Sequence, residues 1–112
     1  MAVNKRGRHS FLLPQQPVIT AWASVAGKKE SEGPLGHCFD LTSQDTHFGQ
    51  KSWEQAEKQM QKLALDTLLQ KAGMERHQLG LVFSGDLLNQ CIGSSFTLRN
   101  TGVPHLGLYG AC

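Results

Sequence analysis

The stretch from Ser52 to Gly73 constrains the fold most, because it carries both ends and the apolar face of one long helix. Ser52 and Gln55 form a capping-box pattern, and Gly73 suits a left-handed C-cap. Apolar residues recur between them at helical spacing: Trp53, Ala56, Met60, Leu63, Ala64 and Leu68, widened by Leu65 and Leu69. The pattern predicts a helix over 53–72 that places this stripe in the core and packs on more than one neighbour.

Three short apolar segments surround this helix and are typical of strands, at 18–26, 79–84 and 105–109. The middle one is a nearly continuous apolar run, as expected for a strand buried on both faces. Strands that alternate with helices favour an α/β fold with a mostly parallel sheet and right-handed crossovers. We therefore expect the last two strands to be parallel and not joined as a hairpin.

A second helix is predicted over 88–100, between the last two strands. Its inward-facing residues are expected to be Ile92, Phe96 and Leu98. Small residues that permit close approach of another backbone follow one another at Gly93, Ser94 and Ser95. We expect this helix and the last strand to lie at a dimer or domain interface. Further core candidates are Phe39 and Phe83, with Trp22 in the core or at an interface.

The 112 residues, 39% of them hydrophobic, suffice for one small domain or for part of a larger one. Residues 1–17 are basic and predict a flexible lead-in, which leaves 18–112 as the folded part. The formal charge of +2 is too small and too evenly spread to imply a nucleic-acid partner. No apolar run reaches the roughly 18 residues of a membrane span, and Pro14 cuts the N-terminal run short of a signal peptide.

The cysteines and histidines do not form a recognisable metal-binding pattern. There are three cysteines with no C-x-x-C spacing, which disfavours a disulfide framework or a zinc knuckle and fits a reducing compartment: Cys38, Cys91 and Cys112. None of the five histidines pairs with another at helical i, i+4 spacing. We expect no metal site and no cofactor.

The turn after the predicted strand 79–84 carries three polar side chains, Asp86, Asn89 and Gln90. Ligands of open α/β sheets bind at the carboxyl ends of parallel strands, so these residues are candidates for binding a ligand or a subunit. The alternative, which we favour, is an ordinary strand-to-helix turn in which Asp86 caps the following helix.

Two motifs give the chain a family resemblance: GDLLNQ at 85–90 and LGLYGAC at 106–112. In this order and separation they resemble the N-terminal third of the stage V sporulation protein AD family, a branch of the thiolase-like superfamily in spore-forming bacteria. Weaker support comes from Gly33-Pro34-Leu35-Gly36, Phe39-Asp40 and Ser52-Trp53-Glu54-Gln55-Ala56-Glu57. The resemblance implies an incomplete N-terminal part of a thiolase-like αβαβα fold. Because a full member is roughly three times longer, we expect the chain to be a fragment.

The same resemblance implies a function. This branch binds dipicolinic acid and moves it into the developing spore with membrane partners, so the expected partners are this ligand, other spore membrane transport proteins and, in the full-length protein, a second copy. The expected location is the cytoplasmic face, peripheral to the spore inner membrane. By this resemblance, Cys112 matches the reactive cysteine of the superfamily's enzymes. From the residues alone, the alternative is that Cys112 is a small buried cysteine at the end of a strand.

Two alternatives remain beside ligand binding. The first is an acyltransferase or condensing enzyme in which Cys112 is the nucleophile. The second is a truncated product without function. We do not expect catalysis by this chain itself, because the helix after Cys112 and the histidine partners of the superfamily's enzymes would lie beyond residue 112.

Overall fold

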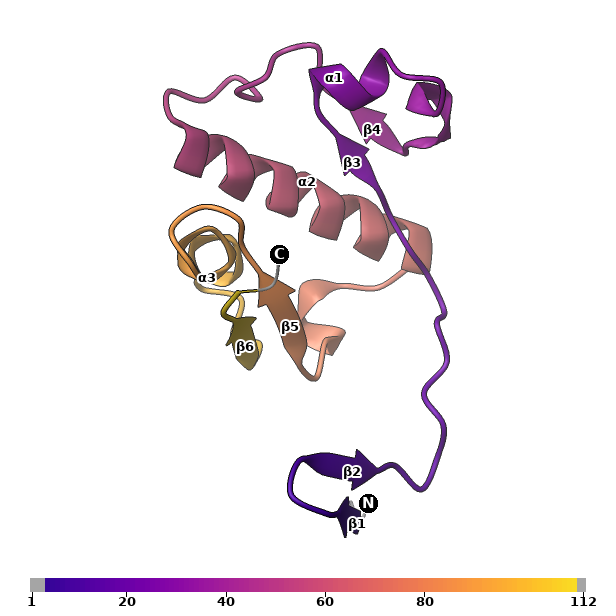
Figure 1. The fold of residues 1–112 in the computed structure, drawn as a ribbon. Coiled ribbons are helices and arrows are strands. Elements are labelled where there is room, and N and C mark those ends of the chain that lie inside the picture. Colours follow the sequence, from indigo (N-terminus) through magenta and orange to yellow (C-terminus); the bar gives the residue numbers. More distant parts are fainter. Residues whose placement is uncertain (1–3, 111–112) are drawn as a thin grey trace.

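The computed structural model describes residues 4–110, and Figure 1 shows the long helix α2 across the middle of the molecule. The architecture is mixed α/β with small parallel sheets, as predicted. In chain order the elements are β1 (Asn4–Arg6), β2 (Ser10–Leu12), β3 (Val25–Ala26), α1 (Lys28–Ser31), η1 (Gly36–Cys38), β4 (Leu41–Thr42), α2 (Trp53–Ala72), η2 (Arg76–Gln78), β5 (Val82–Gly85), α3 (Ile92–Leu98) and β6 (His105–Leu108).

Helix α2 has the predicted bounds, because both of its ends are fixed by local hydrogen bonds. The Ser52 hydroxyl oxygen accepts from the Gln55 N–H at 3.3 Å. The Gln55 side chain accepts from the N–H of Lys51 at 3.3 Å, one residue earlier than the standard capping box. Gly73 ends the helix with φ 63°, in the left-handed region that glycine adopts without strain.

The apolar stripe of α2 lies in the core over most of its length. Ala56 and Leu69 are buried, and Met60 and Leu68 are half-buried. Trp53, predicted as core, is 55% exposed, and its ring lies 4.1 Å from the ring of His47. The prediction for Trp53 is wrong because the first residue of α2 lies beyond the sheets, among loop residues.

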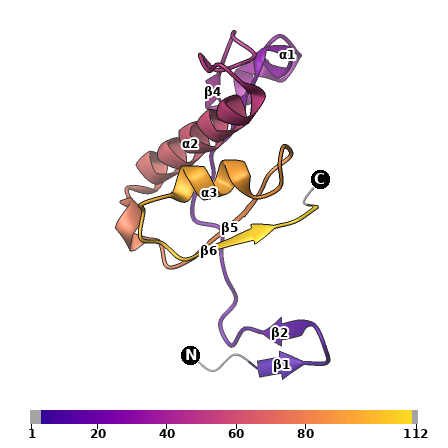
Figure 2. The same cartoon turned by 90° about the vertical axis from the view of Figure 1, so that its left-hand side faces the viewer.

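Strands β5 and β6 are parallel, with Val82 opposite His105 and Gly85 opposite Leu108, and α3 is the crossover between them. This confirms the predicted β-α-β connection. Exposure alternates along both strands, and Phe83 is 62% exposed. A strand buried on both faces was expected; within residues 4–110 one face is covered, because α2 and α3 both lie on the same side of the pair (Figure 2).

The predicted strand 18–26 is much shorter in the structure. Val25–Ala26 alone forms β3, which pairs in parallel with β4, a strand that was not predicted from the sequence. Ile19 is 86% exposed, and Trp22 is exposed beneath the ammonium of Lys71, which lies 5.7 Å from its ring centroid. The strand is short because β4 offers only two residues for pairing.

Asp40 joins the β3–β4 pair to the C-terminal half of α2. Its carboxylate accepts from the Ser24 N–H at 2.8 Å and from the Lys71 ammonium at 2.7 Å. The Lys71 ammonium and the Ser24 N–H hold the pKa of the Asp40 carboxyl below its usual value. This ion pair therefore fixes the position of the extended chain beside α2.

Helix α3 is shorter than the predicted 88–100. Asn89 and Cys91 have positive φ angles of 44° and 67°, so the helix begins only after Cys91. The inward face consists of Gly93, Ser94, Thr97 and Leu98. Leu98 was correctly placed, whereas Ile92 and Phe96 are exposed and their predicted inward orientation is wrong.

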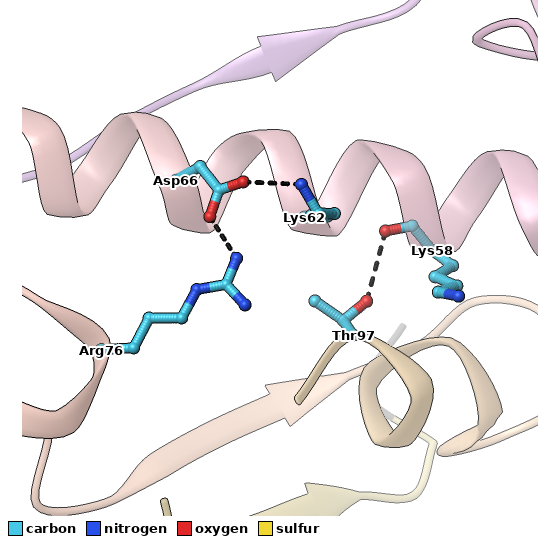
Figure 3. A network of polar contacts seen from close by, with 5 residues as sticks. All are labelled: Lys58, Lys62, Asp66, Arg76 and Thr97. Carbon is cyan, nitrogen blue, oxygen red and sulfur yellow. Dashed lines mark hydrogen bonds and ion pairs between the residues drawn. The ribbon is translucent and has the colours of Figure 1, made fainter. Parts of the chain in front are cut away.

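The small residues of α3 do allow another backbone to come close, and that backbone is α2 of the same chain. The Thr97 hydroxyl donates to the backbone oxygen of Lys58 at 3.2 Å (Figure 3). Bulky side chains at these positions would hold the helices apart, so Ile92 and Phe96 point outward. Their place at a dimer or domain interface stays a prediction.

A second polar contact ties α2 to η2. The Asp66 carboxylate accepts from Lys62 at 2.9 Å and from the guanidinium of Arg76 (Figure 3). Partial burial raises the pKa of Asp66, but the hydrogen bonds from Arg76 and Lys62 outweigh it, so the pKa lies below its usual value. The turn that follows α2 is thus held against the helix.

The N-terminal residues form an antiparallel hairpin, which the sequence analysis did not predict. Strands β1 and β2 pair with Arg6 opposite Ser10, and Gly7 in the turn has φ 65°. The hairpin lies apart from the helices (Figure 1). The Cα radius of gyration is 16.1 Å, against about 13 Å for a compact chain of this length.

Candidate functional site

The turn between β5 and α3 lies at the carboxyl edge of the parallel pair, where ligands of α/β sheets bind. Asp86 in this turn is 2% exposed. Its carboxylate accepts from the Ser94 N–H at 3.1 and 3.2 Å and from the Gln61 side-chain amide at 3.0 Å. This geometry is that of the helix-capping alternative: the carboxylate is used inside the chain and leaves little of itself for a ligand.

Asp86 stays ionised at neutral pH although it is buried. Burial raises its pKa, but hydrogen bonds from Gln61, from Ser94 and from the Gly93 N–H outweigh that effect, and the pKa lies below its usual value. A buried carboxylate with this many donors fixes the start of α3 relative to α2.

Glu57 on α2 holds the next two residues of the turn. Its carboxylate accepts from the Leu87 N–H at 2.6 Å and from the Leu88 N–H at 3.2 Å. Glu57 was not among the residues predicted for the site. The available signal was the i, i+3, i+7 spacing of Glu54, Glu57 and Gln61, which puts three polar side chains on one helix face.

The other two candidate residues also bond within the chain. The Asn89 side-chain amide donates to Glu54 at 2.9 Å. The Gln90 side-chain oxygen accepts from the Gly110 N–H at 2.7 Å. Gln90 therefore ties the motif 85–90 to residue 110 of the motif 106–112, and these are the two motifs that carry the family resemblance.

Cys112 follows Gly110 by two residues in the sequence, and it lies outside the described residues 4–110. Its assignment as a pocket cysteine or nucleophile therefore stays a prediction. The hydrogen bond from Gly110 to Gln90 does bring the chain leading to Cys112 to the same sheet edge as the turn.

A serine–histidine contact lies on the covered face of the same two strands. The Ser84 hydroxyl and the His105 Nε2 are 2.5 Å apart. Cys91 packs on the neighbouring Gly107, where an added Cβ would lie 2.6 Å from its sulfur. Within residues 4–110 no hydrogen bond fixes the second ring nitrogen of His105, so the arrangement lacks the orienting group of a catalytic triad.

An apolar hollow lies beside the turn. Its volume is about 480 Å³, and its lining includes Phe48, Trp53, Met60, Leu87 and Leu88. In the part of the chain that the structure describes, no three His, Cys, Asp or Glu side chains gather closely enough to hold a metal ion. None of the described helices is long and apolar enough to cross a membrane.

The sequence profile of the family described as "Stage V sporulation protein AD (SpoVAD)" matches residues 7–112. This chain belongs to the stage V sporulation protein AD family. Over 106 residues it is 36% identical to stage V sporulation protein AD of Bacillus subtilis (strain 168). The match covers 95% of this chain and 31% of that relative, so the chain spans about a third of the length of the curated relative.

Membership in the stage V sporulation protein AD family confirms the resemblance carried by the two motifs, and it makes this a sporulation protein. The turn 85–90 and the Gln90–Gly110 contact both lie within the matched residues. These two features of the described chain are therefore the basis of the function proposed below.

Proposed function

We propose that the chain forms one side of a dipicolinic acid site in a sporulation protein that takes this compound into the developing spore. The observation that supports this most is the 2.7 Å hydrogen bond between Gln90 and Gly110, because it joins the two motifs at the carboxyl edge of parallel strands. The protein acts in this proposal as a binding module of thiolase-like fold.

Dipicolinic acid is a flat aromatic dianion, which needs an apolar wall and hydrogen-bond donors in a dry pocket. The apolar hollow beside the turn offers the wall, with Phe48 and Trp53 in its lining. Asp86 and Glu57 already accept internal N–H donors, which lowers the repulsion that two free carboxylates would exert on a dianion. Further donors and cations would come from the two thirds of the family protein outside the match.

Calorimetric titration of dipicolinic acid into a full-length family protein that carries these residues tests the proposal. We expect heat of binding, and we expect Gln90→Ala to weaken the affinity about tenfold, since about one hydrogen bond of positioning is lost. Gln16→Ala, in the exposed lead-in, is the matched control and should bind as the unchanged protein does. Absence of heat from the folded protein contradicts the proposal.

The alkylation rate of Cys112 distinguishes a cysteine in a pocket from an ordinary buried cysteine. In the full-length protein we expect Cys112 to react with iodoacetamide faster than Cys38 or Cys91, because a helix start lowers a thiol pKa. Cys38 is exposed, so accessibility alone does not explain a slower rate there.

Mass spectrometry of partially alkylated protein measures these rates. Equal labelling of Cys112 and Cys91 at pH 7 rejects the pocket assignment. The acyltransferase alternative requires in addition an acyl adduct on Cys112 after incubation with an acyl thioester. Calorimetric binding of dipicolinic acid without any such adduct favours the binding module.

We also propose the assembly expected from the resemblance: a homodimer of the full-length protein, peripheral to the spore inner membrane, beside other spore membrane transport proteins. The exposed Ile92 and Phe96 on the outer face of α3 support an interface there. Sedimentation equilibrium of the full-length protein with Phe96→Ser tests it, and an unchanged dimer removes α3 from the interface.

A further inference from the structure

The N-terminal hairpin is the most exposed segment of the chain. Every residue from Asn4 to Thr20 is exposed. Figures 1 and 2 show the hairpin separated from the helices by an extended stretch of chain. A hairpin of two short strands is marginally stable in water by itself, so a surface that it can lie on would stabilise it.

The charge of this segment has a single sign. The hairpin carries Lys5, Arg6 and Arg8, and no acidic residue precedes Glu30. The remainder, from residue 30 to 112, carries six basic and nine acidic residues. The charge is therefore not evenly spread, contrary to the expectation from its overall value, and the positive excess lies in the first 29 residues.

The hairpin combines these cations with exposed apolar side chains. Phe11 is 66% exposed, and Leu12 and Leu13 are also exposed. Lys5 lies directly opposite Phe11 in the register, and opposed residues of an antiparallel pair share one face. Basic side chains next to Phe and Leu suit the headgroup region of an anionic bilayer, where the cations meet phosphates and the apolar groups reach the acyl boundary.

We propose that the hairpin Asn4–Leu12, extended by Leu13, docks on an anionic phospholipid surface. A nucleic acid would also attract the cations, and Phe11 offers bases one stacking face. The exposed Leu12 and Leu13 offer none, whereas all three side chains partition into a membrane interface, which favours the lipid surface. The inference rests on the peripheral membrane location proposed above and names its contact; it is independent of the dipicolinic acid site.

Flotation of the full chain with vesicles tests the docking. We compare phosphatidylcholine vesicles containing 30% phosphatidylglycerol with vesicles of pure phosphatidylcholine. We expect binding to the anionic vesicles only, and a fall of about 100-fold in the partition coefficient for Lys5→Gln/Arg6→Gln/Arg8→Gln, at about fivefold for each cation near the surface. Phe11→Ser/Leu12→Ser should reduce partitioning at least tenfold.

The matched control removes three exposed lysines outside the hairpin, in Lys28→Gln/Lys29→Gln/Lys51→Gln. It loses the same formal charge and should weaken partitioning less than threefold. If the control and the hairpin variant lose equal affinity, or if Phe11→Ser/Leu12→Ser has no effect, the docking proposal is overturned. Tighter binding to a single-stranded oligonucleotide than to anionic vesicles overturns it in favour of nucleic acid.

The failure of this inference is distinguishable from failure of the proposed function. A chain that binds anionic vesicles equally well with and without its hairpin cations retains the peripheral location and loses the hairpin as its contact. Calorimetric titration of the full-length triple hairpin variant with dipicolinic acid should give an unchanged affinity, because every substituted residue lies in the lead-in.

Discussion

Replacing Asp86 by alanine is expected to lower the free energy of unfolding by about 3 kcal/mol, because the buried donors of Ser94 and Gln61 lose their acceptor. The removed carboxylate follows β5 and accepts from α2 and α3, so its loss also removes a link between the two helices. Urea denaturation followed by far-UV circular dichroism measures the change. Ser95→Ala, exposed on α3, is the control and should change the free energy of unfolding by less than about 0.5 kcal/mol. A loss for Asp86→Ala no larger than for the control contradicts the capping role.

The same carboxylate predicts a pH dependence. The pKa of Asp86 in the folded state lies below 3.8, its usual value, so its ionised form is favoured by folding. Its contribution to stability is fully present above that unfolded value and is lost as the pH falls through the folded pKa. The difference in unfolding free energy between the unchanged chain and Asp86→Asn should stay constant from pH 7 to about 5 and shrink below 3.8. A difference that grows on acidification would have the opposite sign and contradict this account.

Leu69→Ala is the second substitution with a large expected effect, a loss of about 3 kcal/mol in the free energy of unfolding. Leu69 is 7% exposed, and the buried apolar side chains among residues 4–110 are few: Ala26, Ala56, Leu69 and Leu98. A chain with so small a core has a modest margin, so the folded fraction at 25 °C should fall visibly. The control Leu35→Ala removes an equal side chain that is 64% exposed and should change stability by less than about 0.5 kcal/mol. Equal effects of the two substitutions would place Leu69 outside the core.

The parts of the fold that the sequence predicts are those with local causes. Helix α2 begins and ends where expected because Ser52 and Gly73 supply both caps within a few residues of the helix itself. The parallel pair β5–β6 is also predictable, since a helix-forming stretch between two apolar runs requires a crossover.

The wrong predictions concern contacts between distant segments. Periodicity alone assigned Ile92 and Phe96 to the inner face of α3, whereas close packing on α2 selects the small residues. The apolar run 18–26 has the composition of a strand, but the length of a strand depends on its partner, and β4 pairs with two residues only.

In the candidate site, too, the local features were predicted and the contact between distant segments was not. The turn 85–90 was recognisable from its polar residues after a strand, and the capping role of Asp86 was one of the stated alternatives. Glu57 was missed because the donors that its carboxylate binds are far away in the sequence. They are the N–H groups of Leu87 and Leu88, which lie 30 and 31 residues further along the chain. Sequence spacing shows that a polar face exists on α2, and tertiary contact decides which backbone groups it holds.

The uncovered outer face of the β5–β6 pair bears on biosynthesis. The pair and its crossover need only residues 82–108, so they can close as soon as this short segment has left the ribosome. At that moment Phe83, Leu106 and Leu108 present an apolar surface to water. An apolar surface of this kind makes a newly made chain prone to aggregate for as long as it stays open to water.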